Sequence, residues 1–219
     1  MASVSARLIG YPRIGPGREL KWALERAWSG RLTIDEFNDR ITALRAAHLD
    51  EQRGLIGSAV DDFFLYDEVL ETAMQLGLVP ADLPGAPADD PFGVLTVLAR
   101  GSIDREAWEM TKWFDANYHY VVPEIDSLPE RIKPLPWRAP LGDADTAWAI
   151  LGPFSLVKLS KLADSIDATQ LVAAAGRALW TFVREQVRRD PAFRLQVDEP
   201  WLGMALSHGD RALLDAAYA

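Results

Sequence analysis

The chain contains no cysteine among its 219 residues. This absence excludes disulfide bonds, a cysteine nucleophile and a zinc site built from thiolates of this chain. Histidine is scarce as well: His48, His119 and His208 lie far apart, and none belongs to a His-Glu-x-x-His pair. The sequence therefore predicts no metal ligands and no catalytic residue of a recognised motif in this chain.

Long hydrophobic runs are also missing. The apolar run over residues 146–157 is too short to span a membrane and is broken by Gly152-Pro153. The N-terminus lacks the long apolar core of a signal peptide, so we expect a cytoplasmic protein that does not contact a membrane.

Familiar phosphate and acyl-transfer motifs are absent. The sequence holds no Gly-x-Gly-x-x-Gly, no Gly-x-x-x-x-Gly-Lys-Ser/Thr and no Gly-x-Ser-x-Gly. The formal net charge of −9 argues against nucleic acid as a partner, although it leaves room for a local basic site that binds a small polyanion.

Hydrophobic periodicity predicts an α/β fold. Apolar residues recur at helical spacing in six segments, near residues 18–29, 33–51, 67–76, 92–100, 167–183 and 209–218. Thr33 with Glu36 predicts a capping box at the start of the second segment, and Asp167 with Gln170 predicts a cap at the start of the fifth. Five short strands alternate with them, at residues 6–10, 55–60, 118–122, 146–151 and 193–197. This alternation favours one parallel sheet with right-handed crossovers, whose functional residues gather at the carboxyl ends of the strands.

The most informative element is Gly10-Tyr11-Pro12-Arg13 followed by Arg18-Glu19-Leu20-Lys21. Arg18 and Lys21 are three residues apart and share a helix face in the first turn, where the macrodipole disfavours cations and favours bound anions. We interpret Arg13, Arg18 and Lys21 as a candidate anion site. The alternative is an exposed basic cluster that Glu19 and Glu25 partly neutralise.

Three further sets of residues carry weaker signals. Lys112 lies among aromatic residues ahead of a strand and is either an anion ligand or a side chain covering an apolar surface. Asp198-Glu199-Pro200 follows a strand and supplies either an acid–base pair or a strand stop, as Asp61-Asp62 does after an earlier strand. His119, between two tyrosines, is typical of a hydrogen-bonded structural residue.

Six motifs together resemble one family in order and spacing, over most of the chain. They are Gly10-Tyr11-Pro12-Arg13-Ile14-Gly15, Arg18-Glu19-Leu20-Lys21, Glu109-Met110-Thr111-Lys112-Trp113-Phe114, Asn117-Tyr118-His119-Tyr120, Leu151-Gly152-Pro153 and Asp198-Glu199-Pro200. In this respect the sequence resembles the N-terminal domain of cobalamin-independent methionine synthase.

The resemblance implies a TIM-barrel-like (β/α)8 domain of a two-barrel enzyme that transfers a methyl group from 5-methyltetrahydropteroyl-polyglutamate to homocysteine. It assigns contacts with the folate's polyglutamate tail to Arg18, Glu19, Leu20, Lys21 and Lys112, with Arg13, His119, Asp198 and Glu199 as secondary candidates. The family's zinc and homocysteine site belong to a C-terminal barrel outside this chain. We therefore expect residues 1–219 to form one incomplete barrel domain, because five strands are fewer than the eight of a closed barrel.

The expected function is that of an N-terminal segment of this methyltransferase, which binds the folate tail and is inactive without a C-terminal catalytic domain or chain. The alternative from another class is a non-enzymatic module that binds folylpolyglutamate, oligomerises, or is completed by a partner. A third alternative is a distinct acid–base enzyme that uses Asp198 and Glu199.

Overall fold

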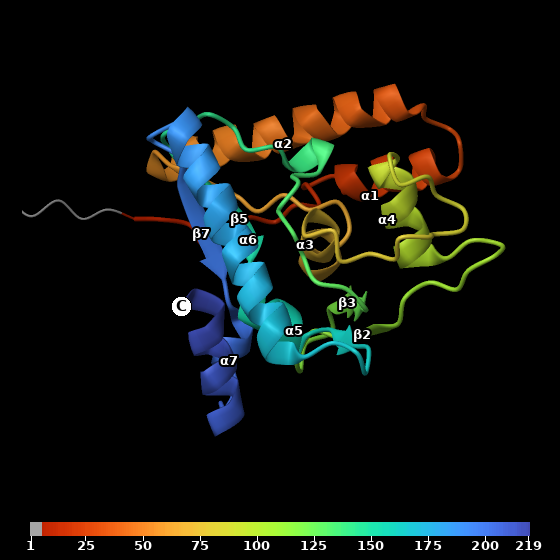
Figure 1. The fold of residues 1–219 in the computed structure, drawn as a ribbon. Coiled ribbons are helices and arrows are strands. Elements are labelled where there is room, and N and C mark those ends of the chain that lie inside the picture. Colours follow the sequence, from red (N-terminus) through yellow and green to blue (C-terminus); the bar gives the residue numbers. More distant parts are fainter. Residues whose placement is uncertain (1–5) are drawn as a thin grey trace, which may run out of the picture. The chain divides into compact units, whose positions relative to one another are not determined.

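The computed structural model describes residues 6–219 (Figure 1). The chain divides into two compact units. The first unit comprises Met1–Leu65, described from residue 6, with Trp137–Ala149 and Asp190–Gln196. The second comprises Tyr66–Pro136, Ile150–Arg189 and Val197–Ala219. Helices and parallel strands alternate along the chain, which confirms the predicted α/β class. The expectation of a single domain stays a prediction.

The first unit is built from two helices and the beginning of a sheet. Its elements are α1 (Glu19–Trp28), α2 (Ile34–Ile56), β1 (Ala59–Asp61) and the first residues of β5 (Thr146–Leu151) and β7 (Arg194–Asp198), both of which end in the second unit. The strand order is β1-β5-β7, and β1 runs parallel to β5 with Ala59 opposite Thr146 and Asp61 opposite Trp148.

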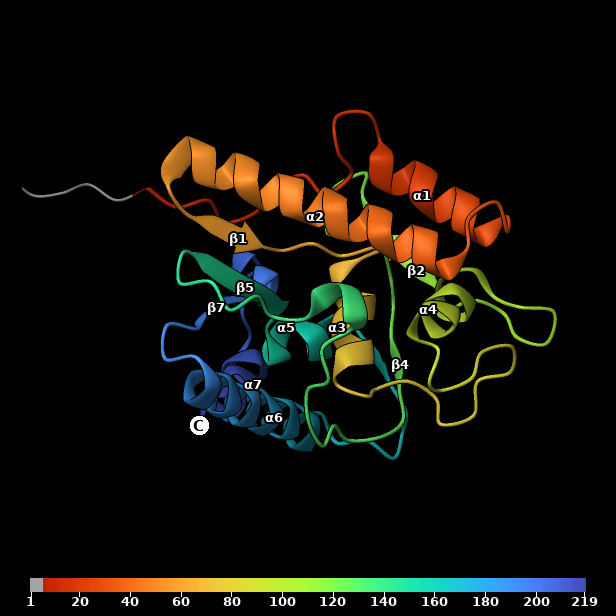
Figure 2. The same ribbon diagram turned by 90° about the horizontal axis from the view of Figure 1, so that it is seen from above.

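Helix α2 begins and ends at clear capping signals. Thr33 and Glu36 form the predicted capping box, in which each side chain bonds the other residue's backbone N–H. The helix ends at Gly57, which adopts the left-handed conformation with φ 76°. The strand predicted over residues 55–60 is therefore shorter: Leu55 is a helical residue with an exposed fraction of 68 %, and β1 starts only at Ala59. Figure 2 shows α1 lying along α2.

The second unit holds most of the remaining helices and two small sheets. Its elements are α3 (Glu68–Gln75), α4 (Pro91–Arg100), β2 (Met110–Lys112), β3 (His119–Val121), β4 (Glu124–Ile125), α5 (Pro153–Lys158), β6 (Lys161–Leu162), α6 (Ala168–Arg189), η2 (Pro200–Gly203) and α7 (His208–Tyr218). The 3-10 turn η1 (Pro136–Arg138) leads from this unit into the first. Strands β2 and β3 are antiparallel, whereas β4 and β6 are parallel.

Helices α6 and α7 approach closely because of a glycine. A Cβ atom on Gly176 would lie 2.0 Å from the carbonyl oxygen of Ala217, so only glycine fits at this crossing. Asp167 accepts the N–H of Gln170 at 2.8 Å, which is the predicted cap of α6. Ser207 caps α7 through a second capping box with Asp210.

Three further details of the strand prediction were wrong. Residues 6–10 form no strand; the carbonyl of Ile9 accepts a hydrogen bond from the Gln196 side chain instead of joining a ladder. The strand around His119 pairs antiparallel with β2, which the sequence did not predict, and its Val121 N–H donates to the Asp67 carboxylate. In residues 6–219 the strands thus form three separate sheets and not one.

Residues 6–219 contain no helix that is both long and apolar enough to cross a membrane.

Candidate functional site

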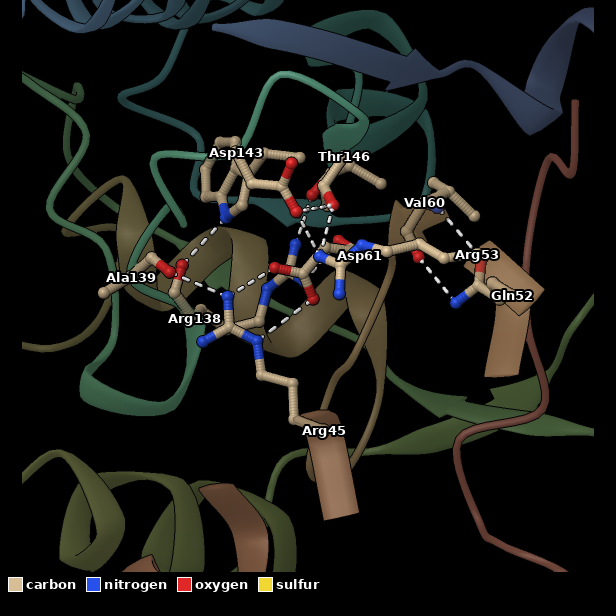
Figure 3. Close-up of polar contacts among 11 residues, drawn as sticks. Arg45, Gln52, Arg53, Val60, Asp61, Arg138, Ala139, Asp143 and Thr146 are labelled. Carbon is tan, nitrogen blue, oxygen red and sulfur yellow. Dashed lines mark hydrogen bonds and ion pairs between the residues drawn. The ribbon is translucent and has the colours of Figure 1, made fainter. Parts of the chain in front are cut away.

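A buried ionic cluster lies at the carboxyl end of β1 (Figure 3). The Asp61 carboxylate accepts two hydrogen bonds from Arg45, one of them from Nε at 3.2 Å. Arg138 Nη1 lies 3.6 Å from Asp61 Oδ1 and donates to the Asp61 carbonyl at 2.7 Å. Asp61 and Arg138 are 1 % and 0 % exposed, so both charges are withdrawn from water.

Aromatic rings and backbone carbonyls complete the surroundings of Arg138. Its guanidinium carbon lies 4.1 Å from the ring centre of Phe64 and 5.3 Å from that of Trp148. Its Nη2 donates to the Ala149 carbonyl, and the Trp148 indole donates to the Arg138 carbonyl at 2.8 Å. The sequence singled out Asp61 but neither arginine, because no motif spacing links positions 45, 61 and 138.

The neighbouring residues of α2 bind the same part of the sheet (Figure 3). The Gln52 amide donates to the Val60 carbonyl at 3.1 Å and accepts the Val60 N–H at 2.9 Å, which satisfies both backbone groups on the outer edge of β1. Arg53 donates to Asp143 and, at 2.9 Å, to the Thr146 hydroxyl. These contacts fix α2 on β1 and β5.

The Gly10-Tyr11-Pro12-Arg13 motif contacts the second acid of the strand end. The Tyr11 N–H donates to the Asp62 carboxylate at 2.7 Å. Burial raises the pKa of Asp62 to about 6, against the lowering effect of the Tyr11 hydrogen bond. The His48 ring stacks at a tilt between Tyr11 and Phe63, and burial lowers its pKa. Arg13 lines the same small hollow.

The predicted anion site lies at the start of α1. Arg18 is the exposed N-cap residue in a left-handed conformation with φ 61°, which non-glycine residues seldom adopt. Within the part of the chain that the structure describes, the N–H groups of Glu19 and Lys21 have no hydrogen-bond partner. Leu20 is fully buried and anchors the turn.

Local acids neutralise part of this cluster. The Glu19 carboxylate accepts the Gly17 N–H at 3.0 and 3.2 Å, and so holds the loop in place. Lys21 forms a half-exposed ion pair with Glu25 at 3.5 Å. Glu25 thus partly neutralises Lys21, whereas the Arg18 guanidinium forms no ion pair within residues 6–219.

Lys112 and His119 are brought together by the antiparallel pair. They lie directly opposite each other in the register of β2 and β3, and both side chains are exposed. His119 Nδ1 lies 3.1 Å from the Asn117 carbonyl, which agrees with a structural role for the ring. Trp113, which follows Lys112, makes edge contacts with three other aromatic rings, those of Phe114, Tyr118 and Tyr120.

Glu199 joins two of the sequence motifs. Its carboxylate accepts the N–H groups of Phe154 at 3.1 Å and Ser155 at 2.6 Å, at the start of α5. A Cβ atom on Gly152 would lie 2.2 Å from the Glu199 carboxyl carbon, so the glycine of Leu-Gly-Pro makes room for the acid of Asp-Glu-Pro. The Tyr218 hydroxyl also donates to Glu199, at 2.5 Å, and burial together with this contact raises the pKa of Tyr218.

These contacts divide the predicted residues into two groups. Arg13 and the Arg18–Lys21 segment belong to the first unit, and Lys112, His119, Asp198 and Glu199 belong to the second. Within the second unit, the Phe114 ring lies 5.7 Å from that of Trp201, which links the hairpin to the segment after β7. Glu199 is engaged by backbone and hydroxyl donors, an arrangement that favours a structural role over acid–base chemistry. Residues 6–219 hold no group of three acidic or histidine side chains arranged to bind a metal ion.

Residues 5–219 match the sequence profile of the family described as "Cobalamin-independent synthase, N-terminal domain". The chain is also similar to curated proteins named 5-methyltetrahydropteroyltriglutamate–homocysteine methyltransferase. It is 36 % identical to the protein of Salinibacter ruber over 98 % of this chain and 30 % of the relative. It is 39 % identical to that of Ralstonia pickettii over 90 % of this chain and 27 % of the relative.

A plant relative gives the same result. The chain is 32 % identical to methyltransferase 1 of this name from Oryza sativa subsp. japonica, over 98 % of this chain and 30 % of the relative. The chain thus spans about 30 % of the length of the curated relatives that it matches.

Proposed function

Because the chain belongs to the family of cobalamin-independent synthase N-terminal domains, we propose that it binds the polyglutamate tail of 5-methyltetrahydropteroyl-polyglutamate. In this proposal the methyl transfer to homocysteine takes place in a C-terminal catalytic domain or partner chain. The relatives' names, which contain both a triglutamate substrate and homocysteine, support the reaction. A cytoplasmic location remains a prediction from the sequence.

The observation that carries the proposal lies at the start of α1. Among residues 6–219, the Arg18 guanidinium has no ion pair, and the N–H groups of Glu19 and Lys21 have no hydrogen-bond partner. A glutamate tail is a chain of carboxylates, and carboxylates bind both guanidinium groups and the positive end of a helix. The left-handed backbone of Arg18 is strained, and backbone strain in proteins concentrates at ligand-binding sites.

The second unit contains a further candidate ligand for a carboxylate, the ammonium group of Lys112. Lys112 is exposed at the end of β2, and the aromatic cluster around Trp113 stiffens the hairpin that carries it. An ammonium on a rigid hairpin binds a carboxylate at lower entropic cost than one on a mobile loop. We therefore include Lys112 among the tail contacts.

The residues of this chain do not fit the zinc that the family uses. The chain has no cysteine, and residues 6–219 provide no group of three possible ligands. We accordingly propose no methyl-transfer step by this chain and expect no turnover from it alone. An assay of the purified chain with methylated folate, homocysteine and added zinc tests this point, and product above the enzyme-free background would contradict it.

The binding role is tested by charge reversal. We expect Arg18→Glu with Lys21→Glu to weaken binding of 5-methyltetrahydropteroyl-triglutamate at least tenfold, measured by titration calorimetry, since two attractive contacts become repulsive. The matched control is Arg177→Glu with Arg211→Glu, which reverses two exposed arginines on α6 and α7. An affinity equal to that of the unchanged chain would refute the proposal.

A further inference from the structure

A groove of about 430 Å³ lies between α1 and α2 in the first unit. Helix α1 contributes Trp22, Ala23 and Arg26 to it, and α2 contributes Arg40, Ile41 and Leu44. Ala23 and Ile41 are buried and form an apolar floor, whereas Trp22 is 47 % exposed and forms a wall. The groove therefore combines an apolar surface with two guanidinium groups.

The two arginines are available to a ligand. Neither Arg26 nor Arg40 forms a hydrogen bond or an ion pair through its side chain within residues 6–219. The Glu36 carboxylate accepts hydrogen bonds from Thr33, and these lower the pKa of Glu36. The charge of Arg40 lowers this pKa by a smaller amount. Glu19, the one acid among the lining residues, is engaged by the Gly17 N–H.

The groove is continuous with the proposed tail site. Gly17 and Glu19, the sequence neighbours of Arg18, are among its lining residues. The Lys21 ammonium lies 5.6 Å from the centre of the Trp22 ring, so it stands at the rim. Trp22 and Arg26 are one turn apart on α1, and Arg26 lies about 10 Å along the helix axis from Glu19, the residue that follows Arg18.

These dimensions match a short γ-glutamyl chain. One γ-linked glutamate contributes five main-chain bonds, so two units extend about 12 Å. Each unit carries one α-carboxylate for a cation and two methylene groups for an apolar floor. The substrate named for the relatives is a triglutamate, which has two glutamates beyond the first.

We propose that the groove between α1 and α2 binds the outer glutamates of the tail, with Arg26 and Arg40 as the residues that select tail length. This inference rests on the proposed function, since it extends the anion site at Arg18. Arg18 receives the inner carboxylates, and the two groove arginines receive the outer ones.

The test compares two probes, 5-methyltetrahydropteroyl-monoglutamate and 5-methyltetrahydropteroyl-triglutamate, on the full chain. We expect Arg26→Gln with Arg40→Gln to weaken triglutamate binding roughly tenfold and to leave monoglutamate binding unchanged, because two charge-assisted contacts are lost. The control variant, Arg177→Gln with Arg211→Gln, removes the same charge from exposed positions on α6 and α7. Thermal melts confirm that each variant is folded.

A second measurement reports the location of the ligand. The indole N–H resonance of Trp22, assigned with Trp22→Phe, should shift on addition of the triglutamate and not of the monoglutamate. Equal loss of triglutamate affinity in the groove variant and its control, or no preference for the triglutamate in the unchanged chain, would overturn the inference. A loss with Arg18→Glu and Lys21→Glu but not with the groove variant would refute the inference alone, whereas no loss with either variant would refute the proposed function as well.

Discussion

Acidic residues lie at the ends of strands β1 and β7, and the two strand ends neutralise those acids by different means. At β1, two arginine side chains surround the Asp61 carboxylate. At β7, the backbone N–H groups that open α5 and the Tyr218 hydroxyl surround the Glu199 carboxylate. The first acid is held by full charges and the second by dipoles.

The difference determines what each acid contributes to stability. In a buried ion pair, the attraction between the two charges offsets the free energy lost by desolvating them. When one partner is removed, the desolvation cost of the other charge is no longer offset, and stability falls. Removal of a carboxylate at a helix start costs less stability, because the N–H groups that it leaves can bind water. Carboxylates at the ends of two strands of one sheet therefore predict two magnitudes of effect.

The largest expected effect follows from removal of the β1 acid. Asp61→Asn removes the carboxylate that the fully buried Arg138 and the buried Arg45 both contact, so we expect the free energy of unfolding to fall by about 3–5 kcal/mol. Urea denaturation followed by circular dichroism measures this change. A loss below about 1 kcal/mol would show that the backbone carbonyls at Ala139 and Ala149 suffice to hold the arginines.

A smaller effect is expected at the β7 end. Glu199→Gln keeps one acceptor but presents an amide group to the N–H groups of α5, and we expect a loss of about 2 kcal/mol. Gly152→Ala should cause a similar loss, because the added Cβ would occupy the position of the Glu199 carboxyl group.

A double-mutant cycle tests the connection between these two residues. If Gly152→Ala acts by displacing Glu199, then the double variant should be hardly less stable than either single variant. Additive losses would mean that the glycine serves the backbone and not the acid.

The comparison also shows how far the sequence alone could lead. Local signals were predicted correctly: the capping box of Thr33 and Glu36, the Asp167 cap and the strand over residues 146–151 all depend on neighbours in the chain. The partners of Asp61 were not predicted, since Arg45 and Arg138 lie 16 and 77 residues away and carry no motif. Only the folded chain identifies them.

The sequence motifs were recognised, but the contact between two of them could not be predicted from the sequence. Leu151-Gly152-Pro153 and Asp198-Glu199-Pro200 were recognised separately, but their mutual contact depends on the space that Gly152 leaves for Glu199. The segment at residues 6–10 has the apolar residues of a strand and yet forms none, because strand formation also requires a ladder partner. Propensity indicates what a segment can form, and packing determines what it forms.

The last expected effect has the opposite sign and concerns Asp62, the neighbour of Asp61. Because burial raises its pKa to about 6 while the unfolded value is near 3.9, the folded state binds more protons between about pH 4 and 6, and stability falls as the pH rises through that interval. Asp62→Asn keeps an acceptor for the Tyr11 N–H and removes the charge. The rise in pKa from near 3.9 to about 6 corresponds to at most about 3 kcal/mol of added stability at pH 7, and we expect none below pH 4. Denaturation of both variants at several pH values measures this difference. A gain that is independent of pH would show that shape and not charge limits this position, and a loss at pH 7 would mean that Asp62, like Asp61, is stabilised as an anion.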